Sequence, residues 1–184
     1  MSKKSPWKHL IVVTALCSAL SISNAQAASN SFFNDLSGIW SGSGKAYLAK
    51  YGEISAKCRV AITGAETKVA MSGSCGMLVF QQALGLSIRN AGGNRYVGTY
   101  TGSKTGPAQL DGTLRGDRLV MKIKWGGLVN GDRTAQMVLE RTGPDSLAQT
   151  VNDKVAGKNR STSHFTFKRE NISASVAKLA IRPQ

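Results

Sequence analysis

Residues 119–125 read Leu-Val-Met-Lys-Ile-Lys-Trp, with an apolar side chain at every second position. A period of two is typical of a β-strand that has one face in a core and the other in water. The same alternation returns at residues 135–140 and again at residues 164–168. From residue 36 onward the chain is therefore predicted to be all-β.

Turn residues separate the apolar runs. Glycine, asparagine, aspartate and proline cluster between them, because tight turns need their backbone conformations or their side-chain hydrogen bonds. Connections this short make strands that are neighbours in sequence pair in space. We expect an antiparallel up-and-down meander of about eight to ten strands, which must close or stack to hide its edges. The predicted turns lie at residues 64–66, 91–94, 115–117, 130–132 and 143–145.

The first 27 residues have the composition of an export signal. Three lysines accompany an apolar run at residues 10–20, and Ala25-Gln26-Ala27 places small residues at the cleavage positions. The apolar run is too short for a transmembrane helix, which takes about 20 residues, and no later stretch is longer and equally apolar. We expect cleavage near Ala27, release into the periplasm or the medium, and no transmembrane helix.

The remainder divides into an N-terminal segment (28–35), a β-barrel domain (36–170) and a C-terminal tail (171–184). Within the barrel, residues 77–84 break the strand period, because they are apolar on nearly every side and contain no turn signal. They form either a short helix that closes one barrel end or a strand buried on both faces. The side chains at 81–84 favour the helix.

Cys58 and Cys75 are the two cysteines left once the signal is removed. An even pair in an exported domain is typical of a disulfide rather than of a metal or catalytic site. If the two face each other in a hairpin, residue 60 faces 73 and residue 62 faces 71, so both apolar sets share one face. The sequence therefore predicts a Cys58–Cys75 disulfide and a hairpin loop at residues 65–68.

Residues 36–42, Leu-Ser-Gly-Ile-Trp-Ser-Gly, resemble the first strand of lipocalins and related calycin barrels. Those families open with Gly-x-Trp, whose indole plugs the closed end, and an arginine near the end of the last strand packs across it. The resemblance implies a lipocalin-like barrel with Gly38 and Trp40 in the plug and Arg169 as the covering cation. The mature chain also resembles exported barrels of Gram-negative bacteria, and this second resemblance implies no activity.

The sequence contains few residues in a pattern that is typical of a catalytic site. His164 is the only histidine left after the signal, and its alternation with Phe165 and Phe167 places it on the outer face. The carboxylates are scattered, several of them in turns, and neither a nucleophile motif nor a metal-ligand spacing accompanies them. We expect no catalytic residue, no metal and no cofactor.

The chain is strongly basic. Its 184 residues include 24 Lys and Arg against 10 Asp and Glu, a net charge of +14, and loss of the three signal lysines leaves +11. Such an excess attracts polyanions, which in the periplasm are lipid, lipopolysaccharide and acidic polysaccharide, although it could also serve solubility alone. Aromatic side chains do not interleave with the lysines, which argues against nucleic acid. The candidate anion-binding residues are Arg115, Arg118, Lys122, Lys124 and Lys168.

Two functions of different classes fit these features. The first is a non-enzymatic periplasmic barrel that binds an apolar or amphiphilic ligand inside, or an anionic envelope component outside. The second is a structural or inhibitory envelope protein with a filled core, acting through protein–protein contacts. The candidate ligand-lining residues are Tyr96, Tyr100, Met121, Trp125, Met137, Phe165 and Phe167.

Overall fold

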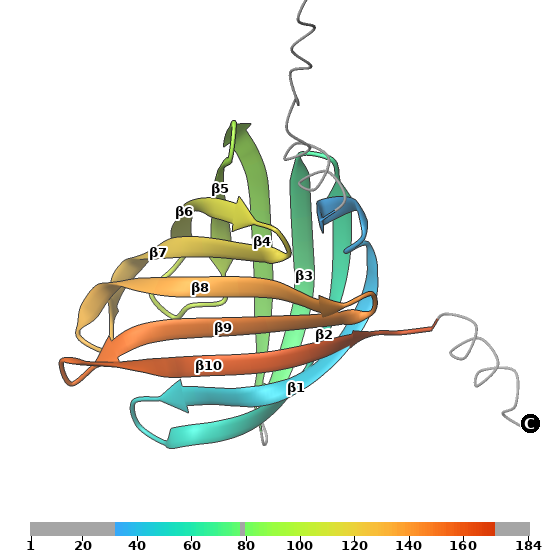
Figure 1. Ribbon diagram of the computed structural model, residues 1–184. Helices are drawn as coiled ribbons and strands as arrows, with labels where there is room; N and C mark the ends of the chain where they lie inside the picture. Colours follow the sequence, from blue (N-terminus) through green and yellow to red (C-terminus); the bar gives the residue numbers. More distant parts are fainter. Residues whose placement is uncertain (1–31, 78–79, 172–184) are drawn as a thin grey trace, which may run out of the picture.

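The computed structural model describes residues 32–77 and 80–171. Within them, ten antiparallel strands form one closed barrel, in which each strand pairs with its neighbours in sequence and β1 pairs with β10 (Figure 1). The predicted all-β meander is confirmed. The strands are β1 (Gly38–Leu48), β2 (Gly52–Ala65), β3 (Lys68–Met77), β4 (Phe80–Gly92), β5 (Arg95–Thr101), β6 (Ala108–Arg115), β7 (Arg118–Val129), β8 (Asp132–Gly143), β9 (Ser146–Val155) and β10 (Lys158–Arg169).

The side chains of β7 alternate across the barrel wall as predicted. Leu119, Met121 and Ile123 are buried, whereas Lys122 and Lys124 are exposed. Because each pleat reverses the side-chain direction, every strand contributes apolar residues to the inside. These residues form one continuous core.

A helical turn at residues 32–34 precedes the first strand and contributes to that core. Phe32 and Phe33 are fully buried, and the ring of Phe33 meets the ring of Tyr96 edge-on, with 5.2 Å between centroids. Aromatic pairs in this geometry add to the stabilisation that burial provides. Two residues of the segment expected to precede the barrel therefore pack inside it.

Glycines permit the wall to close. A Cβ atom on Gly44 of β1 would lie 2.0 Å from the carbonyl oxygen of His164 on β10, and one on Gly112 of β6 would lie 2.0 Å from that of Val120 on β7. No larger residue fits such an approach without moving the backbone. Glycine at these inward positions lets the strands bend sharply and coil into a barrel.

The helix favoured for residues 77–84 is wrong. Residues 80–84 belong to β4 and pair one by one with β3, from Met77↔Phe80 to Gly73↔Leu84; residues 78 and 79 lie outside the described residues. Helix propensity differs among ordinary residues by less than about 1 kcal/mol per residue. The hydrogen bonds and packing of the neighbouring strand outweigh that preference.

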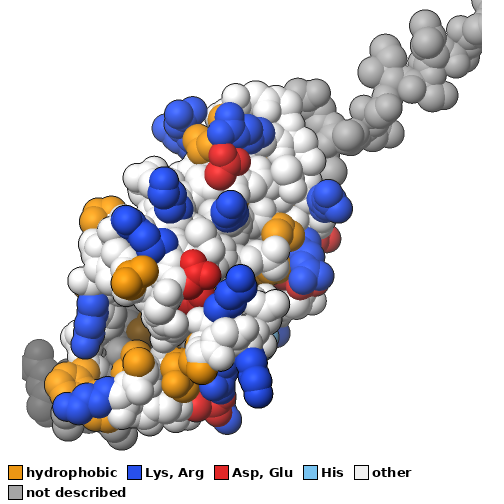
Figure 2. Space-filling model, turned by 90° about the vertical axis from the view of Figure 1, so that its left-hand side faces the viewer, with side chains coloured by type: hydrophobic (Ala, Val, Ile, Leu, Met, Phe, Trp, Pro, Cys, Tyr) orange, Lys and Arg blue, Asp and Glu red, His pale blue; other side chains and the backbone are white. Residues whose placement is uncertain are grey.

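The outer faces of the strands carry the charge. Figure 2 shows one face of the molecule, on which Lys and Arg side chains are more numerous than Asp and Glu and lie scattered between uncharged side chains. This distribution matches the basic excess of the sequence. The wall is thus apolar inside and positively charged outside.

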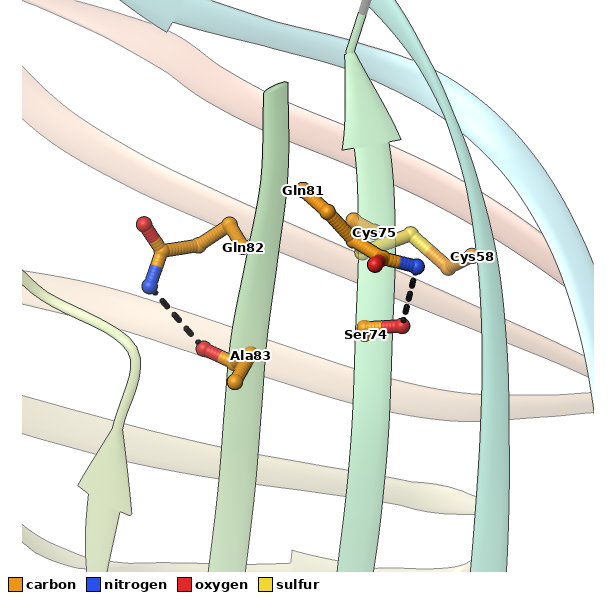
Figure 3. Close-up of a disulfide and its surroundings, with 6 residues drawn as sticks. All are labelled: Cys58, Ser74, Cys75, Gln81, Gln82 and Ala83. Carbon is orange, nitrogen blue, oxygen red and sulfur yellow. Dashed lines mark hydrogen bonds between the residues drawn. A yellow bond between two sulfur atoms is a disulfide. The ribbon is translucent and has the colours of Figure 1, made fainter. Parts of the chain in front are cut away.

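The predicted disulfide is confirmed. Cys58 on β2 and Cys75 on β3 are directly opposite each other, with a Cα–Cα distance of 4.0 Å and a disulfide between them (Figure 3). The predicted register holds along the whole hairpin, but the loop is shorter than predicted: Ala65 pairs with Lys68, so only residues 66 and 67 form the turn. On the neighbouring strand, Gln81 donates a hydrogen bond to Ser74 at 3.2 Å.

Removing both cysteines should lower stability without changing the fold. The bond closes a short loop, with a sequence separation of 17, so its contribution is at most about 3 kcal/mol. A Cys58→Ala, Cys75→Ala variant should keep the wild-type circular dichroism spectrum and unfold at lower urea concentration. Protein purified from the periplasm should contain no alkylatable thiol before reduction. Two free thiols there would contradict the assignment.

Candidate functional site

The barrel has two different ends. The plugged end, named for the helical turn that fills it, carries the hairpin connections at residues 65–68, 92–95, 115–118 and 143–146. The open end carries the connections at residues 48–52, 101–108, 129–132 and 155–158, together with the end of β3 and the start of β4. Figure 1 shows the helical turn at one side of the barrel and the tips of β7–β10 at the other.

Trp40 and Arg169 meet at the plugged end. The guanidinium carbon of Arg169 lies 4.4 Å from the centroid of the fully buried Trp40 ring, a cation–π contact. Trp40 Nε1 donates a hydrogen bond to the Leu36 carbonyl at 2.9 Å. Arg169 donates to the carbonyl oxygens of Asp35 and Ser37. These contacts tie the chain entering β1 to the end of β10, and Gly38 lies against the Arg169 side chain.

A shallow hollow of about 560 Å³ at the plugged end is lined by ion pairs. Arg141 lies 2.6 Å from Asp35 and 3.5 Å from Asp117, and Arg169 lies 2.9 Å from Asp145. Each cation there faces a carboxylate. We interpret this end as structural.

Inward-facing side chains become more exposed toward the open end. On β5, Tyr96 is buried and Tyr100 is half-buried; on β4, Ile88 is buried and Leu84 is half-buried. Their register places them inside the wall, so solvent reaches them through the open end. We call this region the mouth, formed by the half-buried inward-facing residues Ala46, Ile54, Gln82, Leu84, Tyr100 and Ala135.

Trp125 on β7 borders the mouth. Its ring meets that of Tyr100 edge-on, with 6.3 Å between centroids. In the described part of the chain, its Nε1 is the only fully buried side-chain nitrogen or oxygen that lacks a hydrogen-bond partner. Leaving such a donor unpaired costs about 1–3 kcal/mol. An acceptor atom that reached this buried nitrogen would remove that cost.

A carboxyl group lies near the same end. Asp153 on β9 is 4% exposed and pairs in register with Ala135 of the mouth. It accepts hydrogen bonds from Asn130 Nδ2 at 3.2 Å and from the Lys154 backbone at 2.7 Å. Burial raises the pKa of Asp153, and burial also raises the pKa of the Tyr100 hydroxyl. The site therefore combines an apolar lining with a free donor and a carboxyl group.

The predicted ligand-lining residues all point inward, but they lie at different depths. Tyr100 belongs to the mouth and Trp125 borders it. The other predicted residues lie in the buried core: Tyr96, Met121, Met137, Phe165 and Phe167. Sequence alternation identified the inner face, whereas depth along the barrel depends on how the strands are staggered. It also missed the inward Gln82 and Leu84, because the helix favoured there hid their alternation.

A basic groove of about 550 Å³ lies on the outer wall over β4–β7. Arg95 is held by Asp111 in a bidentate pair, with Nη2–Oδ2 at 2.6 Å and Nε–Oδ1 at 3.2 Å. The other cations that line the groove are Arg89, Lys122 and Lys124, and they form no ion pair with a described residue. The groove therefore presents three uncompensated positive charges.

Only part of the predicted anion-binding set meets in this groove. Lys122 and Lys124 line it. Arg115 and Arg118 flank a turn at the plugged end, where Arg118 lies 3.9 Å from Glu140, and Lys168 donates to Ser146 on the opposite side of the barrel. Arg89 and Arg95 also line the groove but were not among the predicted residues. Their positions on either side of the predicted turn at 91–94 were the available signal, since a hairpin places flanking residues on adjacent strands.

Residues 32–77 and 80–171 contain no group of three or more His, Cys, Asp or Glu side chains that could hold a metal ion. His164 is exposed on the outer face, and its Nδ1 lies 2.9 Å from the Thr150 hydroxyl. No helix among the described residues has the length and apolar character to cross a membrane.

Comparisons with known proteins give information on the fold and not on the family. No family model and no curated protein sequence matches this chain. Among 14 matching chains of solved structure is the protein Rv2717c from M. tuberculosis, with a TM-score of 0.57 and 12% sequence identity. The alignment covers 74% of this chain and 94% of that one. The likeness shows the fold alone.

An ionic clasp fastens the end of β10 outside the plug. Arg59 on β2 donates to Glu170 through Nε at 2.9 Å and Nη2 at 2.8 Å, and Ser41 on β1 also donates to this carboxylate. These hydrogen bonds lower the pKa of Glu170 to about 2. The Glu170 backbone donates to the Ile39 carbonyl at 2.7 Å. The clasp thus joins three strands.

The clasp should make stability depend on pH. Because the pKa of Glu170 falls from 4.5 to about 2 on folding, its contribution is full above about pH 4.5 and is lost as the pH falls toward 2. Glu170→Gln should therefore be less stable than wild type at pH 7, with a difference that shrinks below pH 4. Urea unfolding measures this, with the turn substitution Glu66→Gln as control. A constant difference across this range would contradict the assignment.

Proposed function

We propose that the mature chain is a non-enzymatic periplasmic barrel that takes a small apolar or amphiphilic ligand into its mouth. The observation that carries the proposal is the gradient of burial along the inner face. On β1, β2, β4, β5 and β8, inward-facing residues are buried toward the plug and half-buried at the open end. On the other side of that end, Ala108, Trp125 and Asp153 are buried. A barrel that served only as a filled scaffold has no need of an apolar interior that reaches solvent.

The lining defines the chemistry of the ligand. Its apolar part would contact Ala46, Leu84 and Ala135, which are partly buried and pack against the core. An acceptor atom such as a carbonyl or hydroxyl oxygen would receive the unpaired hydrogen of Trp125 Nε1. Asp153 disfavours a second negative charge nearby. A neutral polar group on an apolar body fits this combination best.

A bulky side chain inside the mouth should block binding, whereas the same side chain outside should not. Ala135 and Gln136 are neighbours on β8, and the first points inward while the second is exposed. The wild type should bind the neutral apolar probe N-phenyl-1-naphthylamine with saturable fluorescence. Ala135→Phe should weaken the affinity at least about tenfold, and Gln136→Phe should change it by less than about twofold.

Melting temperatures of the three proteins should first show that all are folded. Native mass spectrometry of protein from the periplasm then tests for a co-purifying molecule. If the wild type binds no probe, or if Ala135→Phe binds it as tightly as wild type, the mouth is not a binding site. The structural or inhibitory function would then be favoured.

A second candidate function rests on the basic groove. Three cations that form no ion pair with any residue of 32–77 or 80–171 line a concave outer surface, and none of the exposed large hydrophobic side chains described lies among them. Such a surface attracts a flexible polyanion more than an amphiphile. We propose acidic polysaccharide as the anionic envelope component that this groove would bind.

Charge reversal within the groove should weaken polysaccharide binding more than reversal elsewhere. Lys122→Glu with Lys124→Glu should lower the affinity for a polyuronate at least about tenfold, and salt should weaken wild-type binding. Arg115→Glu with Arg118→Glu changes the net charge equally at the plugged end and serves as the control. Both pairs should alter stability by less than about 1 kcal/mol. Equal losses of affinity would mean that only net charge matters.

A further inference from the structure

The large hydrophobic side chains that remain exposed share one end of the barrel. Among the described residues they are Tyr51, Phe80 and Leu128, with 60%, 63% and 67% of their surface exposed. Tyr51 lies in the β1–β2 connection, Phe80 is the first residue of β4, and Leu128 is near the end of β7. All three positions belong to the open end. Single exposed apolar residues are common on surfaces, but their confinement to one end indicates a contact surface.

Cations accompany these side chains. Lys50, Lys104, Lys154 and Lys158 are exposed in or beside the connections of the same end. None of them forms a salt bridge with a described residue, although the Lys50 ammonium lies 5.4 Å from the Tyr51 ring. Figure 2 faces the tips of β7–β10 and shows hydrophobic side chains beside Lys and Arg side chains in the lower part of the view.

The carboxylates of this end are already engaged. Glu53 pairs with Lys45 at 2.7 Å. Asp132 accepts hydrogen bonds from the backbone of Arg133 at 2.5 Å and of Thr134 at 2.9 Å, which hold the turn into β8. These bonds leave the charge of Asp132 in place, but the four exposed lysines outnumber the exposed carboxylates of this end that lack a cation partner among the described residues, so its net charge is positive.

We infer that the open end docks on the surface of a bilayer rich in anionic phospholipid. The rim, which we define as Tyr51, Phe80, Leu128, Lys50, Lys154 and Lys158, combines the two features that hold a protein at such an interface. Apolar side chains enter the boundary between headgroups and acyl chains, and lysines attract the anionic headgroups. The side chains project from hairpin tips, so they reach a surface without unfolding any strand.

A bilayer explains the rim better than a soluble polyanion does. A polysaccharide would use the cations alone and leave the three apolar side chains in water. A bilayer also meets several tips at once, because it is extended, whereas the basic groove on the side wall is concave and lacks exposed large hydrophobic side chains. Docking would also bring the mouth against the lipid, although the inference rests on the rim and holds whatever the mouth binds.

Vesicle sedimentation tests the inference with the mature chain purified from the periplasm. The probes are vesicles of phosphatidylethanolamine with roughly a third phosphatidylglycerol as the anionic lipid, and vesicles of phosphatidylcholine alone. The wild type should bind the anionic vesicles and bind the neutral ones at least about tenfold more weakly. Tyr51→Ser with Phe80→Ser and Leu128→Ser should weaken binding to anionic vesicles at least about tenfold.

Charge reversal supplies a matched pair of variants. Lys154→Glu with Lys158→Glu changes the rim, and Lys122→Glu with Lys124→Glu changes the side wall by the same net charge. The rim pair should lose at least about tenfold in vesicle affinity, and the side pair less than about threefold. Because these lysines are exposed, the pair remains informative if the apolar triple variant fails to fold.

Three results would overturn the inference. The first is a wild type that ignores anionic vesicles at low salt. The second is an equal loss in the rim and side pairs, since net charge alone would then explain binding. The third is a wild type that is dimeric in analytical ultracentrifugation while the apolar triple variant is monomeric. A second copy of the chain would then cover the rim.

Discussion

The close approach of β1 to both β2 and β10 is the contact on which the barrel depends. An antiparallel meander has two edge strands whose backbone groups need partners, and closure joins those edges. Here β1 pairs along its whole length with β2 and, from Trp40 to Ala46, with β10. A Cβ atom on Gly42 would lie 2.4 Å from the Phe167 ring, and one on Gly44 would lie 2.0 Å from a β10 carbonyl. The wall closes there because those side chains are absent.

The closed barrel has two ends, which differ in packing and in the pairing of their charges. At the plugged end, buried aromatic residues fill the interior, Arg169 covers Trp40, and Asp35, Asp117 and Asp145 are paired with arginines. At the open end, the inner face is half-buried, one indole donor is unpaired, and the hairpin tips carry apolar and cationic side chains. Rigidity at one end can hold the other in shape without any contribution from a ligand.

The positively charged side chains lie on two different surfaces of the barrel, the basic groove and the rim. In the basic groove, Arg89, Lys122 and Lys124 lie on a concave wall and can follow a polymer chain. At the rim, lysines flank apolar side chains on separate hairpin tips, an arrangement that suits an extended surface. Net charge alone does not distinguish the two settings. Their separation on the barrel makes it possible to alter one without the other.

Local pattern determined the fold class and one register of this protein. Alternation at 119–125 is a property of neighbouring residues, and two cysteines in one hairpin set which residues face each other. Both depend on short-range geometry, which the order of residues specifies. Tertiary structure decided the rest. The pairing with β3 made residues 80–84 a strand despite their helix propensity, Phe32 and Phe33 entered the barrel end, and Arg89 came to line the same groove as Lys122. Each of these outcomes depends on contacts between segments far apart in the chain, whose energies exceed local preferences but leave no periodic mark in the sequence.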